Sequence, residues 1–278
     1  MTASGEWRQR AVADETAAFV ALLDGADLSA PVPGCPGWTL LDLVRHTGGV
    51  QRWFCVLLRQ GVQEPPRTRD VELRLPERLD AYPAWLAAGG EEAARTFGGI
   101  DPDAPMWVWG ADPHARFWVR RMLYETLVHR TDAEAALGLP SVIDPATAAD
   151  GVDEFLVNLP FATPFAPGVA RLRGAGEVIR FRATDTGHDW YVQLRADGFG
   201  LIAAGAHKRV HQGVHQGAHQ GVHQGAHKAA HEGAHASIRA PAADLLLLLY
   251  GRLDRAADAF AVAGDQRLLT HWFDSSAF

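Results

Sequence analysis

The sequence is poor in cysteine and lacks both a long apolar run and an excess of basic residues. Only two of its 278 residues are cysteines, Cys35 and Cys55. That is too few for a disulfide-stabilised scaffold and is typical of a reducing cytoplasm. The leucine-rich stretch 245–250 is far too short to span a membrane, and residues 1–15 lack the apolar core of a signal peptide. We therefore expect a cytoplasmic protein with no membrane partner.

The charge balance argues against another class of partner. The formal net charge is −7, whereas nucleic-acid-binding proteins favour a basic surface, so we expect no nucleic-acid partner. The chain is 47% hydrophobic and 21% charged, which is ordinary for a globular protein. Its length suggests one large or two modest domains, and the sequence leaves the oligomeric state open.

The first half of the chain carries helical patterns. We expect Thr39 to cap the second helix, with Asp42 three positions on as a near capping box. Asp112 is the expected cap of the fourth helix, and Pro83 and the pair Gly89–Gly90 weaken the third. Four helices joined by long loops predict a bundle, whose core is a common place for a metal site. The expected helices cover residues 6–23, 39–61, 77–97 and 113–137.

The second half has a different character. Another helix is expected at 146–158. Residues 177–183 and 189–196 alternate apolar and polar side chains around a DTGH turn, which is the pattern of a β-hairpin. A further strand at 237–240 and helices within 241–253 and 264–273 complete a small α+β domain. The boundary is expected near 138–144, which divides the chain into domains 1–140 and 141–278.

Histidine recurs every four residues from His207 to His235, and the octet HQGVHQGA occurs twice in tandem, at 211–218 and 219–226. On a helix this spacing would make chelating pairs for zinc, nickel or copper. The glycines in the same stretch oppose a helix, at a cost of about 1 kcal/mol each relative to alanine. We favour a tolerated insertion, at about 206–235, in the tip of a hairpin between two strands. Metal buffering by the repeat is the alternative.

Three residues of the first half could hold a metal ion. Glu125 and His129 lie four residues apart, which places them on one face of a predicted helix. His46 interrupts the apolar stripe of the segment 39–61. Two histidines and one carboxylate with an open fourth position are typical of a catalytic zinc site. The alternative is a hydrogen-bonded Glu–His pair with a separate core histidine, and spacing alone slightly favours it.

Other residues near these motifs have two interpretations. Cys35 could be a reactive thiol or a zinc ligand, but we expect a small filler in the turn PVPGCPGW. Asp132 and Arg130 could support the metal ligands, although surface or ion-pair roles are the expectation.

The motifs together resemble the mycothiol-dependent maleylpyruvate isomerase family. The resemblance rests on CPGWTLLDLVRHTGGVQRW (35–53), RRMLYETLVHRTDAEAALG (120–138), LLLLLYGRL (245–253) and AGDQRLLTHWF (263–273). It covers almost the whole chain except the repeat. One departure is Tyr124, where many relatives carry a histidine.

This resemblance implies a fold and a site. The fold is an N-terminal DinB-like four-helix bundle followed by a small α+β domain similar to sterol carrier proteins. The site is a divalent metal, usually zinc, held by His46, Glu125 and His129. The family also uses an arginine of its C-terminal domain in catalysis, and Arg252 is the candidate here.

The implied function is isomerisation or S-transfer with a low-molecular-weight thiol such as mycothiol. A metal-bound thiol loses its proton, and its thiolate could add to an activated double bond of a small electrophile. Arg252 could hold a substrate carboxylate. The alternative is a non-catalytic metal-binding, ligand-binding or regulatory protein on the same fold, because fold similarity does not transfer a substrate.

Overall fold

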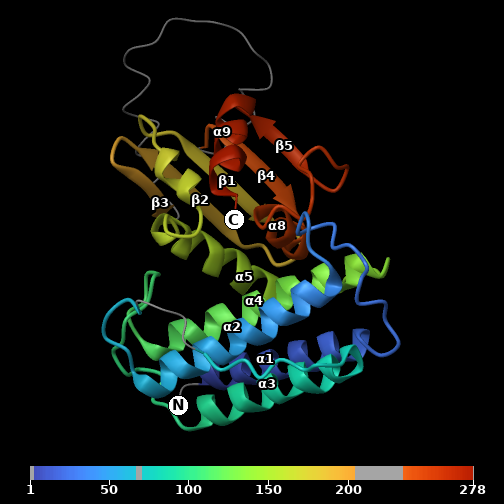
Figure 1. The fold of residues 1–278 in the computed structure, drawn as a ribbon. Helices are drawn as coiled ribbons and strands as arrows, with labels where there is room; N and C mark the ends of the chain where they lie inside the picture. Colours follow the sequence, from blue (N-terminus) through green and yellow to red (C-terminus); the bar gives the residue numbers. More distant parts are fainter. Residues whose placement is uncertain (1–2, 67–70, 204–233, 278) are drawn as a thin grey trace, which may run out of the picture. The chain divides into compact units, whose positions relative to one another are not determined.

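The computed structural model describes residues 3–66, 71–203 and 234–277 (Figure 1). The chain divides into two compact units, residues 1–141 and 142–278, and each is described by itself. No helix within the described ranges is long and apolar enough to cross a membrane.

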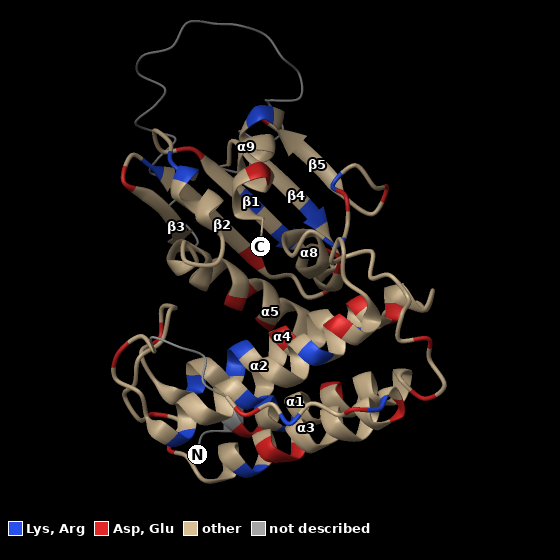
Figure 2. Cartoon of the chain, viewed as in Figure 1, with Lys and Arg blue, Asp and Glu red and all other residues tan. Residues whose placement is uncertain are grey.

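Four long helices build the first unit. Helices α1 and α2 each pack against both α3 and α4. An apolar core that includes Phe19, Leu43, Leu86 and Ala133 joins all four helices. Arginine positions are mixed with those of Asp and Glu along these helices (Figure 2). The bounds are α1 Ala3–Leu22, α2 Leu40–Gln60, α3 Tyr82–Gly98 and α4 Ala115–Ala136.

The start of α2 confirms the expected cap. Thr39 accepts a hydrogen bond from the backbone of Asp42, and the Asp42 side chain accepts one from the backbone of Thr39. This reciprocal capping box satisfies donors that the first turn cannot pair internally. Gly61 ends α2 in the left-handed conformation, with φ of 53°, as is common at helix C-termini.

Two expectations about the other helices were wrong. The third helix begins at Tyr82, after a short 3-10 turn at Leu79–Ala81, and Pro83 lies in its first turn, where proline is tolerated. Asp112 does not cap α4: the N-cap residue is His114, and the Asp112 carboxylate instead contacts the side chains of His114 and Arg116.

The second unit is a five-stranded sheet with flanking helices, in the order β3-β2-β1-β4-β5. Strands β1 and β4 are parallel, and the other neighbours are antiparallel. The expected hairpin of β1 and β2 and the expected strand near 237–240 are confirmed. The bounds are α5 Pro145–Asn158, β1 Val178–Ala183, β2 Asp189–Arg195, β3 Gly198–Ile202, β4 Ala236–Ala240, α8 Ala242–Leu249, β5 Ala261–Gly264 and α9 Gln266–Ser276.

Most of the histidine repeat lies outside the described residues, but its flanking strands correct one expectation. The repeat falls between β3 and β4, and two strands, β2 and β1, separate these in the sheet. The insertion is therefore not in a hairpin tip. The last histidine of the series, His235, is described, and its Nδ1 accepts a hydrogen bond from the backbone of Val178 at 3.0 Å.

Candidate metal centre

The three predicted ligands meet in the first unit. The Oε1 atom of Glu125 lies 3.0 Å from Nε2 of His46 and 3.4 Å from Nε2 of His129. His46 comes from α2, whereas Glu125 and His129 are one turn apart on α4. One donor atom from each residue lies within 4.8 Å of the other two. The two imidazoles and the carboxylate thus converge, as the sequence predicted for a metal-competent set.

A second carboxylate orients one of the histidines. The Oδ2 atom of Asp132 lies 3.0 Å from Nδ1 of His129, the ring nitrogen opposite the one that faces Glu125. Asp132 is 1% exposed. Because the carboxylate accepts a hydrogen bond from Nδ1–H, it favours the tautomer with a free lone pair on Nε2 when His129 is neutral. Asp132 is thus not a surface residue, and the expected ion-pair role is met by His129.

The turn before α2 brings two more side chains to the histidines. The thiol of Cys35 donates to Oδ2 of Asp132 at 3.5 Å, and its sulfur belongs to a second metal-competent group with His129 and Asp132. The Trp38 ring lies 5.0 Å from the His46 ring and 6.3 Å from the His129 ring, between centroids. Cys35 is therefore more than a filler of a tight turn.

Glu125 and His129 each stabilise the charged form of the other. Burial opposes ionisation of Glu125, but hydrogen bonds with His129 and His46 outweigh it and place the pKa of that carboxyl well below its usual range. Burial likewise disfavours the imidazolium of His129. Contacts with Asp132, Cys35 and Glu125 outweigh burial, so that the pKa of His129 lies well above its usual value. Without a metal, the cations beside the carboxylates of Glu125 and Asp132 are His129 and Arg121, whose Nη2 atom lies 3.5 Å from Oε2 of Glu125.

The donor set fits a divalent metal such as zinc. Zinc prefers imidazole nitrogen and carboxylate oxygen, and catalytic zinc sites use three protein ligands. The outer nitrogen of a metal-bound histidine usually donates to a carboxylate, and Asp132 already holds that position beside His129. The side chains of His46 and Glu125 remain 31% and 25% exposed, so the cluster is accessible from solvent.

Two further predicted residues lie apart from this cluster. Arg130, on α4, forms ion pairs with Glu15 of α1 and with Glu134, which agrees with the expected ion-pair role. Arg252 lies in the second unit, three residues after the last residue of α8, and donates to the backbone carbonyl of Tyr250 at 2.6 Å. Its catalytic role stays a prediction.

The sequence signals for the positions of Asp132 and Cys35 differ. Asp132 is three residues from His129, so helical geometry placed it beside that ring, and the sequence contained the signal. Cys35 is 97 residues from its partner Asp132, and no local spacing encodes such a contact.

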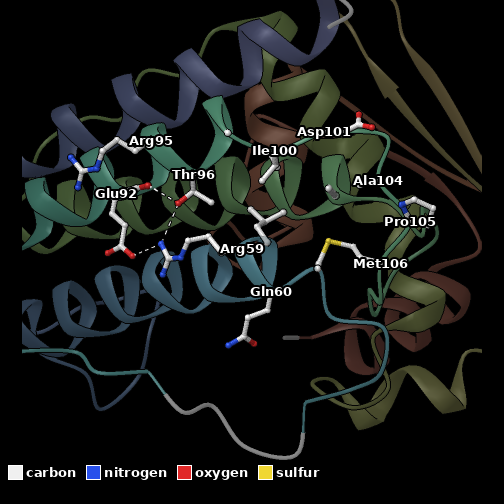
Figure 3. Close-up of a pocket in the computed structure, with 14 residues that line it drawn as sticks. Arg59, Gln60, Glu92, Arg95, Thr96, Ile100, Asp101, Ala104, Pro105 and Met106 are labelled. Carbon is white, nitrogen blue, oxygen red and sulfur yellow. Dashed lines mark hydrogen bonds and ion pairs between the residues drawn. The ribbon is translucent and has the colours of Figure 1, made fainter.

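The first unit also has a surface pocket of about 650 Å³ between the last turns of α2 and α3 and the segment 99–106 (Figure 3). Arg59 donates there to Glu92 at 2.6 Å and to Thr96 at 3.3 Å. Its cationic group is thus already paired. Among the described residues, both metal-competent groups lie at His129 and not in this pocket.

Comparisons with known proteins agree with the sequence motifs. A family model described as the mycothiol maleylpyruvate isomerase N-terminal domain matches residues 9–134. A second, the MDMPI C-terminal domain, matches residues 146–271. No curated protein matches the chain.

Solved structures show the same fold. The chain is similar to the crystal structure of the mycothiol-dependent maleylpyruvate isomerase, with 14% sequence identity and a TM-score of 0.54 over 93% of this chain and 92% of that one. A mutant of that isomerase matches with the same values. The solved relative is an enzyme, and at this identity the likeness shows the fold alone.

Proposed function

Since the chain belongs to the mycothiol maleylpyruvate isomerase family, we propose that it is a metal-dependent enzyme that uses a low-molecular-weight thiol. The metal is divalent, with zinc the best match to the donors, and the thiol is mycothiol or a similar compound. The reaction is isomerisation or S-transfer on a small electrophilic substrate that carries a carboxylate, with maleylpyruvate as the first candidate.

One observation carries this proposal. Two imidazole nitrogens and one carboxylate oxygen converge within 4.8 Å of one another, although His46 and Glu125 are 79 residues apart in sequence. A hydrogen-bonded pair needs only one histidine, and the second histidine at the same oxygen gives the cluster three protein ligands. That number leaves a coordination position for a reactant.

The chain's own residues have distinct roles. His46, Glu125 and His129 would hold the metal, and the partly exposed side of the cluster would receive the thiol. A bound divalent metal stabilises the thiolate form of a coordinated thiol at neutral pH. Asp132 keeps His129 in orientation. The guanidinium of Arg252 would hold the substrate carboxylate through two parallel hydrogen bonds.

The fold and the domain assignment belong to the same proposal. The four helices, each of which packs against two others, would be a DinB-like four-helix bundle that carries the metal site. Residues 141–278 would be an α+β domain similar to sterol carrier proteins that contributes Arg252.

The test is metal content by elemental analysis of a full-length chain whose repeat cannot bind metal. In this repeat-silenced chain, glutamine replaces the seven histidines of residues 207–231, while His235 is kept because it pairs with the backbone of Val178. We expect about one zinc per chain. The variants His46→Ala, Glu125→Ala and His129→Ala should each lose it.

A matched control and an assay complete the test. His114→Ala removes another histidine that is paired with a carboxylate, Asp112, and that is 31% exposed, like His46. It should retain zinc. Turnover of maleylpyruvate should require both mycothiol and the three ligands, and Arg252→Gln should reduce it. Absence of zinc from the parent chain would contradict the proposal, and zinc without thiol-dependent turnover would favour the non-catalytic alternative.

A further inference from the structure

We propose that Cys35 is a positioning residue of the metal centre, acting on His129 through the carboxylate of Asp132. This inference rests on the proposed metal site and adds a residue from outside the two helices that carry the ligands. Its basis is the contact of one thiol and one imidazole with a single carboxylate oxygen.

The contacts form a chain of three groups. The thiol of Cys35 donates to Oδ2 of Asp132 at 3.5 Å, and Nδ1 of His129 lies 3.0 Å from the same oxygen. The sulfur, the oxygen and a ring nitrogen all lie within 4.8 Å of one another. The far nitrogen of that ring faces Glu125. The thiol thus has two routes to the ring of His129, a direct contact and the shared oxygen of Asp132, and the proposed role uses the second.

Burial makes this contact matter. Asp132 is 1% exposed, and a buried carboxylate requires hydrogen-bond donors because it has lost its water. Removal of the thiol takes one donor away from Oδ2 and loosens the carboxylate that orients the His129 ring. An imidazole held less firmly is a poorer ligand, since outer partners of metal-bound histidines fix both ring orientation and basicity.

The turn that carries Cys35 is itself held in place. The backbone N–H groups of Val32 and Trp38 donate to the carbonyls of Trp38 and Cys35 at 3.0 Å each, and Gly37 takes a φ of 85° that favours glycine. Trp38 stacks on the His129 ring at an interplanar angle of 28°. The thiol is thus presented from a fixed turn toward the outer side of the histidine.

The experiment is a double-mutant cycle in zinc affinity. The zinc dissociation constant is measured by chelator competition at one pH, in the repeat-silenced full-length chain. The four proteins are the parent, Cys35→Ala, Asp132→Ala and the double variant. We expect Asp132→Ala to weaken binding about 10- to 100-fold. Cys35→Ala should weaken it about 3- to 10-fold, the range for loss of one hydrogen bond.

The decisive comparison is the effect of Cys35→Ala when Asp132 is already alanine. If the thiol acts through the carboxylate, the second substitution has no further effect, because coupled residues are not additive. Cys35→Ser, which retains a donor, should recover part of the affinity. Cys55→Ala is the matched control, since that cysteine is fully buried in the core, and it should leave zinc affinity unchanged. Asp132→Asn replaces Asp132→Ala in the cycle if the alanine variant does not fold.

The outcomes separate the two proposals. A parent chain that binds zinc tightly, with no loss in Cys35→Ala, overturns the role of Cys35 and leaves the metal site standing. If Cys35→Ala weakens zinc binding equally with Asp132 present and with Asp132 replaced, the role of Cys35 is also overturned. The thiol would then act directly or through the turn. A parent chain that binds no zinc overturns both proposals.

Discussion

Two faces of α4 carry polar clusters, and they differ in whether histidines help to balance the charge of the carboxylates. Toward α1, Arg130 pairs with Glu15 and Glu134. Toward α2, one oxygen of Glu125 contacts His46 and His129, and the other lies 3.5 Å from Arg121. Arginine is permanently charged, so the first cluster carries its own cation at every physiological pH. Histidine changes its charge near neutrality. The second cluster can therefore exchange a proton for a metal ion, whereas the first is a fixed ion-pair network.

The largest expected effect that separates the two clusters is on stability. Arg130→Met leaves two carboxylates without their cation, and breaking a buried pair in this way costs about 3–5 kcal/mol. Glu15 and Glu134 are 19% and 13% exposed, so we expect the lower end, about 3 kcal/mol. Denaturant unfolding would measure this loss, and zinc content should stay at the parent value. Loss of zinc from a folded Arg130→Met chain would contradict the separation of the two faces.

A smaller effect is the pH dependence of the metal-binding cluster. In the metal-free protein the raised pKa of His129 contributes to the free energy of unfolding. This contribution is fully present below about pH 6.5, the pKa of the imidazole in the unfolded chain. This contribution is lost as the pH rises through the raised pKa. The lowered pKa of Glu125 contributes stability above about pH 4.5, the pKa of the carboxyl in the unfolded chain. That stability is lost only as the pH falls through the lowered pKa. Zinc binding must displace the proton of His129, so the zinc-bound protein gains stability as the pH rises.

Thermal unfolding between pH 6 and 9 would check these opposite slopes. Above pH 6.5 we expect the difference in Tm between the zinc-bound and metal-free parent to increase with pH. His129→Gln should remove the part of this pH dependence that arises from the metal-binding cluster. Equal slopes for the two forms would show that His129 does not carry the exchangeable proton.

Sequence periodicity predicted the helices because their signals are local. Thr39 and Asp42 marked the start of α2, and the four-residue spacing of Glu125 and His129 placed both on one face of α4. The short strands β3 and β5 were missed. Their glycine and alanine residues have low strand propensity, and pairing with β2 and β4 makes them strands.

Long-range packing accounts for what the sequence did not predict. Gly89 was expected to weaken the third helix together with its neighbour Gly90. Instead, a Cβ atom at Gly89 would crowd the Arg52 side chain, and one at Gly90 would crowd Thr16. The two glycines therefore allow α3 to approach α2 and α1 closely. The contact of Cys35 with Asp132 likewise depends on how the turn folds back onto α4, which no helical or strand period encodes.

The most direct test of the metal–thiol account is the absorption spectrum of the repeat-silenced chain loaded with cobalt in place of zinc, recorded as mycothiol is added. The account predicts a new sulfur-to-cobalt charge-transfer band that saturates at one thiol per cobalt. This band should also form in Arg252→Gln, because that arginine is proposed to bind substrate. An unchanged spectrum at saturating mycothiol, in a chain that holds one cobalt at His46, Glu125 and His129, would contradict the account, because the metal would then have no position for the thiol.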